Sequence, residues 1–288
     1  MTGISSRMRA LLVRAGSRPS TAEGERLYAI GDLHGRLDLF RALIKRLEAD
    51  AAGRGKMRTR IVVLGDLIDR GPHSRGLLEI IRRMELQNKE HFVVLCGNHE
   101  EMLLASASGD AGGQRLWLAN GGDATLRSYG LHPAEFVELT PEQRGGVLWR
   151  TVGAEMLSWL AALPTHFRSG DYFFCHAGIR PGVALVKQRR EDLLWIRGEF
   201  LSSHRWHGAV VVHGHNEVAE VDVRGNRINI DTAAYRTGQL TAAGLQGAFQ
   251  WFISTSHRYL NRADLDAALD RRAVIDVTAG TAGAIGGS

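Results

Sequence analysis

Short apolar segments recur along the chain, and polar residues follow each of them. Five segments have the length and the β-branched or aromatic content of buried strands: residues 26–30, 60–64, 92–95, 172–175 and 209–212. After each of the first two, apolar residues recur every three or four positions, as in Leu37, Phe40, Leu43 and Leu47, which predicts helices. This β-α-β-α-β order predicts a mostly parallel sheet in an α/β protein.

The rest of the chain has a different pattern. Residues 226–230, 240–245 and 248–253 predict an antiparallel second sheet, with a turn at Gln246-Gly247. Residues 109–150 are rich in Gly and show no strand pattern, so we interpret them as a helical insertion over the site. Residues 261–272 predict a short helix.

The pattern divides the chain into three parts. We expect residues 26–272 to form a single domain that includes the insertion. Residues 1–25 contain four arginines before the first acid and predict a basic, flexible N-terminal arm, whereas residues 273–288, rich in Gly, Ala and Thr, predict a loose C-terminal tail.

Composition narrows the functional classes. The 288-residue chain is 44% hydrophobic, which is enough for a sizeable core, and no apolar stretch is long enough to span a membrane. The net charge is +5, but the Lys and Arg residues are dispersed and not interleaved with aromatics, so no nucleic-acid partner is expected. The only cysteines, Cys96 and Cys175, lie in apolar segments and suit a reducing cytoplasm without disulfides.

Polar residues that favour metal binding follow five strands: Asp32, Asp66, Asn98, His176 and His215. A single Asp after a strand commonly caps a helix. Five polar residues that follow strands at the same sheet edge can instead converge on a shared site. Two neighbouring divalent ions need a bridging carboxylate, with imidazole and amide ligands in the other positions. Nitrogen and oxygen ligands without thiolate favour manganese, iron or zinc. We expect two divalent ions, manganese first and iron or zinc as alternatives.

Five motifs occur in the order found in phosphoprotein phosphatases: Gly31-Asp-Leu-His-Gly35, Gly65-Asp-Leu-Ile-Asp-Arg-Gly71, Gly97-Asn-His-Glu100, His176-Ala-Gly178 and Gly214-His215. Between residues 27 and 235 the chain resembles bacterial members of that family, which belongs to the calcineurin-like metallophosphoesterase superfamily. The resemblance implies a sandwich of two mixed β-sheets flanked by helices in four layers, α-β-β-α.

The resemblance also implies which residues hold the ions. One ion would be held by Asp32, His34 and Asp66, and the other by Asp66, Asn98, His176 and His215. Asp66 would therefore be the bridging carboxylate. His213, two residues before His215, is interpreted as a structural histidine at a strand end.

Four further residues take catalytic roles by the same resemblance. Arg70 and Arg197 would bind the phosphate, while Asp69 pairs with His99. A hydroxide shared by the ions would attack phosphorus in line, and His99 would give a proton to the departing alkoxide.

The resemblance therefore implies a serine/threonine protein phosphatase acting on a phosphorylated protein or peptide. An alternative is a symmetrical dinucleoside tetraphosphate hydrolase or another small-molecule phosphoesterase. Those dinucleotide hydrolases tend to carry Ala in place of Asp69 and Asp in place of Glu100. A non-catalytic module that binds phosphorylated partners is a third hypothesis, but every expected metal ligand and His99 are present. The sequence leaves the oligomeric state open.

Overall fold

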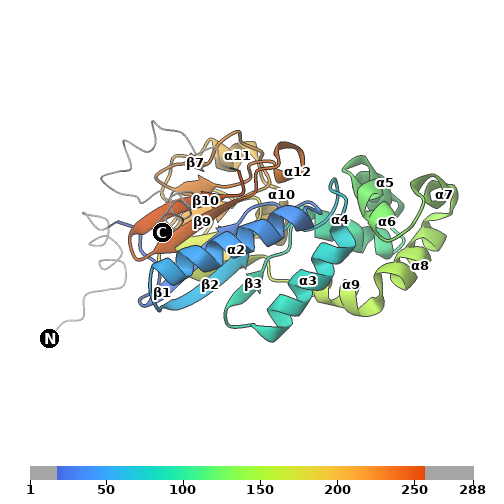
Figure 1. Cartoon of the computed structure of the whole chain (residues 1–288). Coiled ribbons are helices and arrows are strands. Elements are labelled where there is room, and N and C mark those ends of the chain that lie inside the picture. Colours follow the sequence, from blue (N-terminus) through green and yellow to red (C-terminus); the bar gives the residue numbers. More distant parts are fainter. Residues whose placement is uncertain (1–17, 257–288) are drawn as a thin grey trace, which may run out of the picture.

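Two five-stranded β-sheets form the centre of the molecule, in a computed structural model that describes residues 18–256 (Figure 1). In the first sheet the order is β10 (Phe249–Ser254), β9 (Thr241–Gln246), β1 (Glu25–Ile30), β2 (Arg58–Val63) and β3 (Phe92–Val94). In the second it is β4 (His166–Ser169), β5 (Tyr172–Cys175), β6 (Val210–His213), β8 (Arg227–Asn229) and β7 (Asp222–Val223). Both sheets contain parallel and antiparallel pairs, so both are mixed.

Alternate residues of the strands point to opposite sides and build four layers. In β1, Leu27 and Ala29 belong to the core between the two sheets, whereas Tyr28 and Ile30 pack against the helices that cover the first sheet. In β5, Phe174 lies in the core between the sheets, while Phe173 packs on the opposite side with residues of the short helices there. The predicted α-β-β-α sandwich is confirmed.

Helices cover the outer faces of both sheets. The longest, α2 (Leu37–Gly53) and α3 (Ser74–Gln87), follow β1 and β2 as predicted and bury Phe40, Leu43, Leu47, Leu77 and Ile81. The others before β4 are α4 (Asn98–Ala107), α5 (Ala111–Ala119), α6 (Gly122–Ser128), α7 (Pro133–Glu138), α8 (Pro141–Val152) and α9 (Ala154–Ala161). Later in the chain lie the 3-10 helix η1 (Leu185–Lys187), α10 (Arg190–Trp195), α11 (Gly198–Leu201) and α12 (Ala234–Thr237).

Residues 109–150 form helices, as predicted. They contain α5, α6, α7 and α8, which lie together at one end of the molecule, away from most of the sheet (Figure 1). Pro133 and Pro141 each start a helix, where the missing N–H of proline costs no hydrogen bond. We call residues 109–150 the helical insertion.

The predicted composition of the second sheet is wrong. Strands β9 and β10 do pair antiparallel through a turn at Gly247, but β9 joins β1 and so extends the first sheet. Strand β8 pairs in parallel with β6 in the second sheet. The hairpin pattern specified its own pairing correctly, but not the sheet edge to which it is added.

The remaining expectations lie partly outside the described residues. This holds for the predicted helix at 261–272, the tail at 273–288 and the first 17 residues of the basic arm. Within the predicted arm, Thr21 receives a hydrogen bond from Gly247 at 2.8 Å and Ala22 donates one to Ser169 at 3.1 Å.

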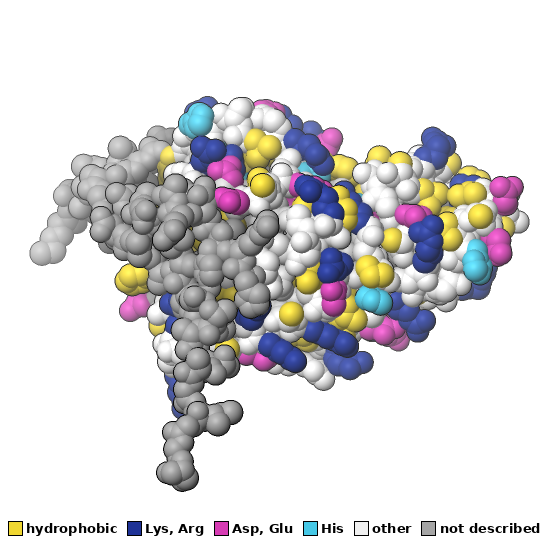
Figure 2. Space-filling model, turned by 45° about the horizontal axis from the view of Figure 1, so that its top comes forward, with side chains coloured by type: hydrophobic (Ala, Val, Ile, Leu, Met, Phe, Trp, Pro, Cys, Tyr) yellow, Lys and Arg dark blue, Asp and Glu magenta, His cyan; other side chains and the backbone are white. Residues whose placement is uncertain are grey.

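None of the helices within residues 18–256 has the length and apolar character needed to cross a bilayer. On the face shown in Figure 2, Lys and Arg side chains are interspersed with Asp and Glu.

A buried polar cluster ties the first sheet to α2. The carboxylate of Asp50 accepts hydrogen bonds from the Tyr28 hydroxyl at 2.6 Å, the Trp251 indole at 2.9 Å and the Arg54 guanidinium at 2.9 Å. Burial, together with the hydrogen bond to Asp50, raises the pKa of Tyr28 above its ordinary value. The folded protein therefore holds the phenol proton more tightly than the unfolded chain does.

This difference predicts a loss of stability in alkali. Stability contributed by Tyr28 is present below the tyrosine pKa of the unfolded chain, about 10, and is lost as the pH rises above it. Tyr28→Phe should cost about 2 kcal/mol at neutral pH, the net value of one hydrogen bond to a charged group. It should also make the fall in stability above pH 10 less steep in urea denaturation. An equally steep fall in the variant contradicts the prediction.

Candidate metal centre

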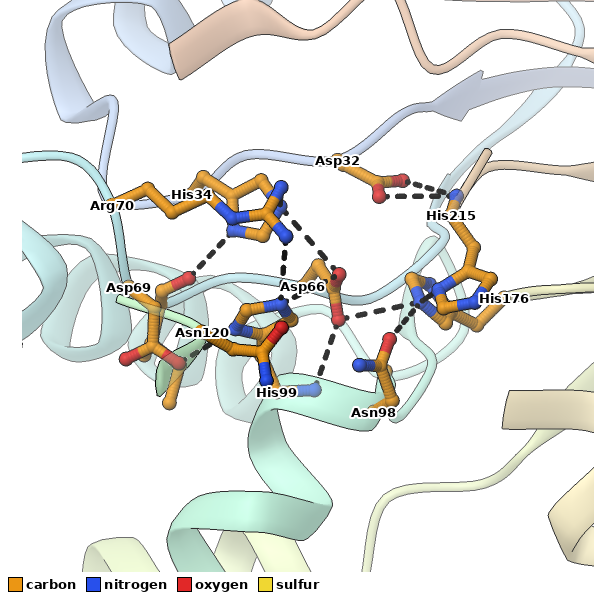
Figure 3. Close-up of polar contacts among 12 residues, drawn as sticks. Asp32, His34, Asp66, Asp69, Arg70, Asn98, His99, Asn120, His176 and His215 are labelled. Carbon is orange, nitrogen blue, oxygen red and sulfur yellow. Dashed lines mark hydrogen bonds and ion pairs between the residues drawn. The ribbon is translucent and has the colours of Figure 1, made fainter. Parts of the chain in front are cut away.

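The carboxyl ends of neighbouring strands bring the predicted ligands to one place. Asp32 and His34 follow β1, Asp66 follows β2, and Asn98 follows β3 at the start of α4. From the second sheet, His176 follows β5 and His215 follows β6. Residues up to 183 positions apart in the sequence therefore meet at one edge of the sandwich (Figure 3).

Asp66 lies at the centre of this group. One carboxylate oxygen is 3.6 Å from His34 Nε2 and 3.7 Å from His99 Nε2, and the other is 3.3 Å from His176 Nε2. Two buried groups able to hold a metal share Asp66: His34, Asp66 and His99 form one, and Asp66, His176 and His215 form the other. Within each group, one ligand atom per residue lies within 4.8 Å of the others. Two buried sites with a common carboxylate are consistent with a dinuclear metal centre.

The imidazole rings are oriented for metal binding by backbone carbonyls. His34 Nδ1 lies 2.9 Å from the carbonyl oxygen of Ile68, and His176 Nδ1 lies 3.0 Å from that of Leu64. A proton on each Nδ1 leaves the lone pair of Nε2 directed toward Asp66. Burial lowers the pKa of both histidines, which favours the neutral imidazole that a metal ion requires.

Two acceptor atoms, His176 Nε2 and Asn98 Oδ1, face each other beside the second group. His176 Nε2 is 3.2 Å from His215 Nδ1 and 2.8 Å from Asn98 Oδ1. Burial and the neighbouring His176 lower the pKa of His215 to about 2, so this ring is neutral as well. A divalent cation at the point where these lone pairs converge would satisfy all of them. The residues present therefore fit a metal ion of the nitrogen- and oxygen-preferring class.

Asp32 occupies a less central position than predicted. Its carboxylate accepts the backbone N–H of His215 at 3.1 and 3.3 Å, and in Figure 3 it points toward that nitrogen. His99, rather than Asp32, completes the group with His34 and Asp66. Burial raises the pKa of Asp32 well above its ordinary value, and the carboxylates of Asp231 and Asp66 raise it further. Bound cations would offset this buried negative charge, so metal binding by Asp32 stays a prediction.

Asp69 and His99 form the predicted pair. His99 Nδ1 lies 2.6 Å from Asp69 Oδ2, and both side chains are buried. Burial opposes the protonated form of His99, but Asp66 and Asp69 outweigh it and raise the pKa of the imidazole. Burial also raises the pKa of Asp69, against the effect of its hydrogen bonds. The Nε2 atom of His99 faces Asp66, so the pair is directed toward the centre of the site.

Both predicted arginines reach this centre. Arg70 donates from Nη1 to His34 Nε2 at 3.0 Å, and its Nη2 lies 3.4 Å from His99 Nε2. Arg197 donates from Nε to His215 Nε2 at 3.1 Å. The two guanidinium groups therefore contact histidines of both metal-binding groups. Arg180 and Arg190, which precede Arg197 in the sequence, form ion pairs with Asp192 and Glu101 instead.

Glu100 holds the loops that carry the central ligand. Its buried carboxylate accepts the backbone N–H groups of Asp66 at 2.9 Å, Leu67 at 2.8 Å and Gly97 at 2.8 Å. A Cβ atom at position 97 would overlap the carboxylate of Asp66, so this close approach requires glycine. The motif Gly97-Asn-His-Glu100 thus contains a predicted ligand, the partner of Asp69 and the support of Asp66.

Further residues at the site were missed from the sequence. Asp231 is buried directly after a predicted strand, the same signal that identified the ligands, and burial raises its pKa to about 7. Glu217 accepts a hydrogen bond from Tyr235 at 3.0 Å and lies 3.4 Å from Arg70. No pattern in the sequence would have identified Glu217 as a residue of the site. His213 is buried edge-on against Phe200, and its Nδ1 lies 3.1 Å from the carbonyl of Gly214.

The backbone of the site is strained. Among residues 18–256, six that are not glycine have a positive φ, and five of them belong to this site: His34, Asp66, Asp69, Arg70 and His215. The left-handed conformation costs such residues about 1–3 kcal/mol each and persists only where surrounding contacts enforce it. Such strain, concentrated on the predicted residues, is typical of a functional site.

Comparison with known proteins agrees with this geometry. Residues 25–242 match the family model described as calcineurin-like phosphoesterase. The chain belongs to this family. It is therefore a metallophosphoesterase, a hydrolase whose metal centre corresponds to the two buried groups around Asp66.

Relatives within the family carry two different names. The chain is 30% identical to "Serine/threonine-protein phosphatase 1" of Salmonella typhimurium, over 76% of this chain and 92% of the relative. It is 25% identical to "Bis(5'-nucleosyl)-tetraphosphatase PrpE [asymmetrical]" of Bacillus thuringiensis, over 74% of this chain and 87% of the relative. A protein serine/threonine phosphatase from Saccharomyces cerevisiae has a similar structure, with a TM-score of 0.52 at 16% identity, covering 85% of this chain and 86% of that one. This structural likeness supports the fold alone.

The shared position of Asp66 generates a prediction about metal content. Asp66→Asn removes a charged oxygen from both groups at once, so we expect protein reconstituted with manganese to lose both ions, with affinity at least about tenfold weaker. Metal analysis after gel filtration measures this. Asp222→Asn, the same change on the distant β7, should leave the metal content unchanged. Full metal occupancy in Asp66→Asn contradicts the assignment.

Proposed function

We propose that this protein is a serine/threonine protein phosphatase that hydrolyses phosphomonoesters on phosphorylated proteins or peptides. The observation that carries the proposal is the 2.6 Å contact between His99 Nδ1 and Asp69, with His99 Nε2 directed into the metal centre. The 30% identical relative named as a serine/threonine phosphatase supports it.

The metal ligands would be the predicted six: Asp32, His34, Asp66, Asn98, His176 and His215. When bound there, two divalent ions lower the pKa of a water molecule and neutralise charge on the phosphoryl group. We propose manganese as the native metal, with iron or zinc as alternatives, because thiolates take no part in the site. Cys96 and Cys175 are both free and buried, which suits the reducing cytoplasm that we propose as the location.

The other predicted residues would bind the substrate and move a proton. Arg70 and Arg197 contact histidines of the two metal groups, so phosphoryl oxygens at the centre would lie between two guanidinium groups. His99, held by Asp69, would donate its proton from Nε2 to the oxygen that departs from phosphorus. A serine or threonine alkoxide is a strong base, so this donor matters most for such substrates.

A second candidate is hydrolysis of a dinucleoside tetraphosphate. The relatives named PrpE favour this second candidate. Their name specifies the asymmetrical reaction, whereas the alternative predicted from the sequence was the symmetrical one. Cleavage of a phosphoanhydride releases a phosphate, which is a weak base and needs little help from a proton donor. The buried Asp69–His99 pair therefore favours a phosphomonoester.

A substrate panel tests the proposed function. Manganese-loaded protein should hydrolyse phosphoserine and phosphothreonine peptides with a higher kcat/KM than diadenosine tetraphosphate, because His99 assists the departure of an alkoxide. Phosphotyrosine peptide and p-nitrophenyl phosphate complete the panel, and Asp66→Asn serves as the inactive control. Preference for the dinucleotide rejects the proposal, and binding without turnover of any substrate indicates a non-catalytic module.

His99→Asn tests the proton donor separately. General acid catalysis contributes about 10²–10⁴-fold, so kcat for phosphoserine peptide should fall by about that factor. The fall should be at least tenfold smaller for p-nitrophenyl phosphate, whose leaving group is a weak base. Manganese content should match that of the wild-type protein, because His99 lies beside Asp66 but is not one of the six proposed ligands. An equal loss for both substrates contradicts the role of His99.

A further inference from the structure

The Asp69 side chain is enclosed by residues of the helical insertion. The indole N–H of Trp117, on α5, lies 3.0 Å from both carboxylate oxygens of Asp69. The hydroxyl of Thr125, on α6, donates to Oδ1 of the same carboxylate at 2.6 Å. Neither Trp117 nor Thr125 belongs to any of the five motifs recognised in the sequence.

Thr125 also holds the backbone of Asp69. The N–H of Asp69 donates to Thr125 Oγ1 at 3.0 Å and to Ser74 Oγ at 3.1 Å. The next residue is held by the insertion too, because the N–H of Arg70 donates to the carbonyl of Gly121 at 3.2 Å. Asp69 and Arg70 have φ values of 72° and 64°, so these contacts enforce a conformation that non-glycine residues rarely adopt.

The arrangement fixes the direction of the carboxylate. Thr125 engages Oδ1, the Trp117 indole lies between both oxygens, and Oδ2 meets His99 Nδ1. Asp69, His99, Trp117 and Thr125 are all at most 1% exposed, so water cannot take the place of a lost donor. A change in the orientation of the Asp69 carboxylate would therefore also reorient the imidazole ring of His99.

We propose that Thr125 and Trp117 are positioning residues of the reaction, which hold Asp69 and through it direct His99 toward the departing oxygen of the substrate. This inference rests on the proposed role of His99. It gives the helical insertion a part in the chemistry, since α5 and α6 support the proton donor from the side opposite the metal centre.

Two threonine substitutions test the proposal. Thr125→Val keeps the shape of the side chain and removes the hydroxyl, whereas Thr125→Ser keeps the hydroxyl. We expect Thr125→Val to lower kcat for phenyl phosphate and phosphoserine peptide by about tenfold, part of the contribution of a general acid. The same variant should stay within about twofold of wild type on p-nitrophenyl phosphate, and Thr125→Ser should stay within about twofold on all three substrates.

Matched controls separate positioning from stability. Thr21→Val also removes a buried hydroxyl with two hydrogen-bond partners, Glu25 and Gly247, and should leave the ratio of phenyl phosphate to p-nitrophenyl phosphate turnover unchanged. Trp117→Phe removes the indole donor and should shift that ratio in the same direction as Thr125→Val. Trp159→Phe, which removes an indole donor to Glu85 elsewhere, should not shift it.

The outcomes are distinct. Equal losses on phenyl and p-nitrophenyl phosphate, a loss of bound manganese, or unchanged kinetics in Thr125→Val and Trp117→Phe overturn the proposal. Failure of both variants to fold, while Thr21→Val and Trp159→Phe fold, assigns the two residues to stability and overturns it as well. If the wild-type protein does not hydrolyse phosphoserine peptide, the proposed function is rejected instead. The ratio of phenyl phosphate to p-nitrophenyl phosphate turnover then still tests the role of Thr125 and Trp117.

Discussion

The buried carboxylate of Asp66 is the constraint on which the site depends. Burial alone favours the neutral acid, but positive charge on the surrounding histidines, His176 first, lowers its pKa. His99, whose own pKa is raised, supplies that charge when His34 and His176 are neutral. An ionised group away from water is costly unless opposite charge and hydrogen bonds surround it. Two cations that share Asp66 would supply that charge, which explains why ligands from both sheets converge on this residue.

The strained backbone extends this constraint to the scaffold. Asp66, Asp69 and Arg70 all have left-handed conformations within one short loop after β2. Glu100 holds the start of this loop through backbone amides, and Thr125 holds its end. Because α4 carries Glu100 and α6 carries Thr125, the loop is fixed between a helix of the sandwich and one of the insertion. Each support lies at a helix or helix start, where rigid geometry makes precise placement possible.

The sequence predicted the parts of the fold that local patterns encode. Strands ending in polar residues brought the predicted metal ligands together, because parallel strands bring their carboxyl ends to one edge. The pattern could not assign the β9–β10 hairpin to a sheet, since alternation specifies a strand's faces and not its neighbour. Trp117 and Thr125 escaped notice because they lie 48 and 56 residues from Asp69, in helices with no motif. Glu100 was visible in a motif, but its partners are backbone amides, which no residue pattern reveals.

The cost of the Asp69 arrangement bears on the choice of substrate. A carboxylate that is 0% exposed, on a backbone with φ of 72°, lowers the stability of the fold unless its contacts compensate. Trp117, Thr125 and His99 all direct their donors at it. For a phosphoanhydride, whose leaving group is a weak base, an oriented imidazole would accelerate the reaction little. For a serine or threonine phosphate, the departing alkoxide needs a proton, and under the proposed function the arrangement would supply one where the bond breaks.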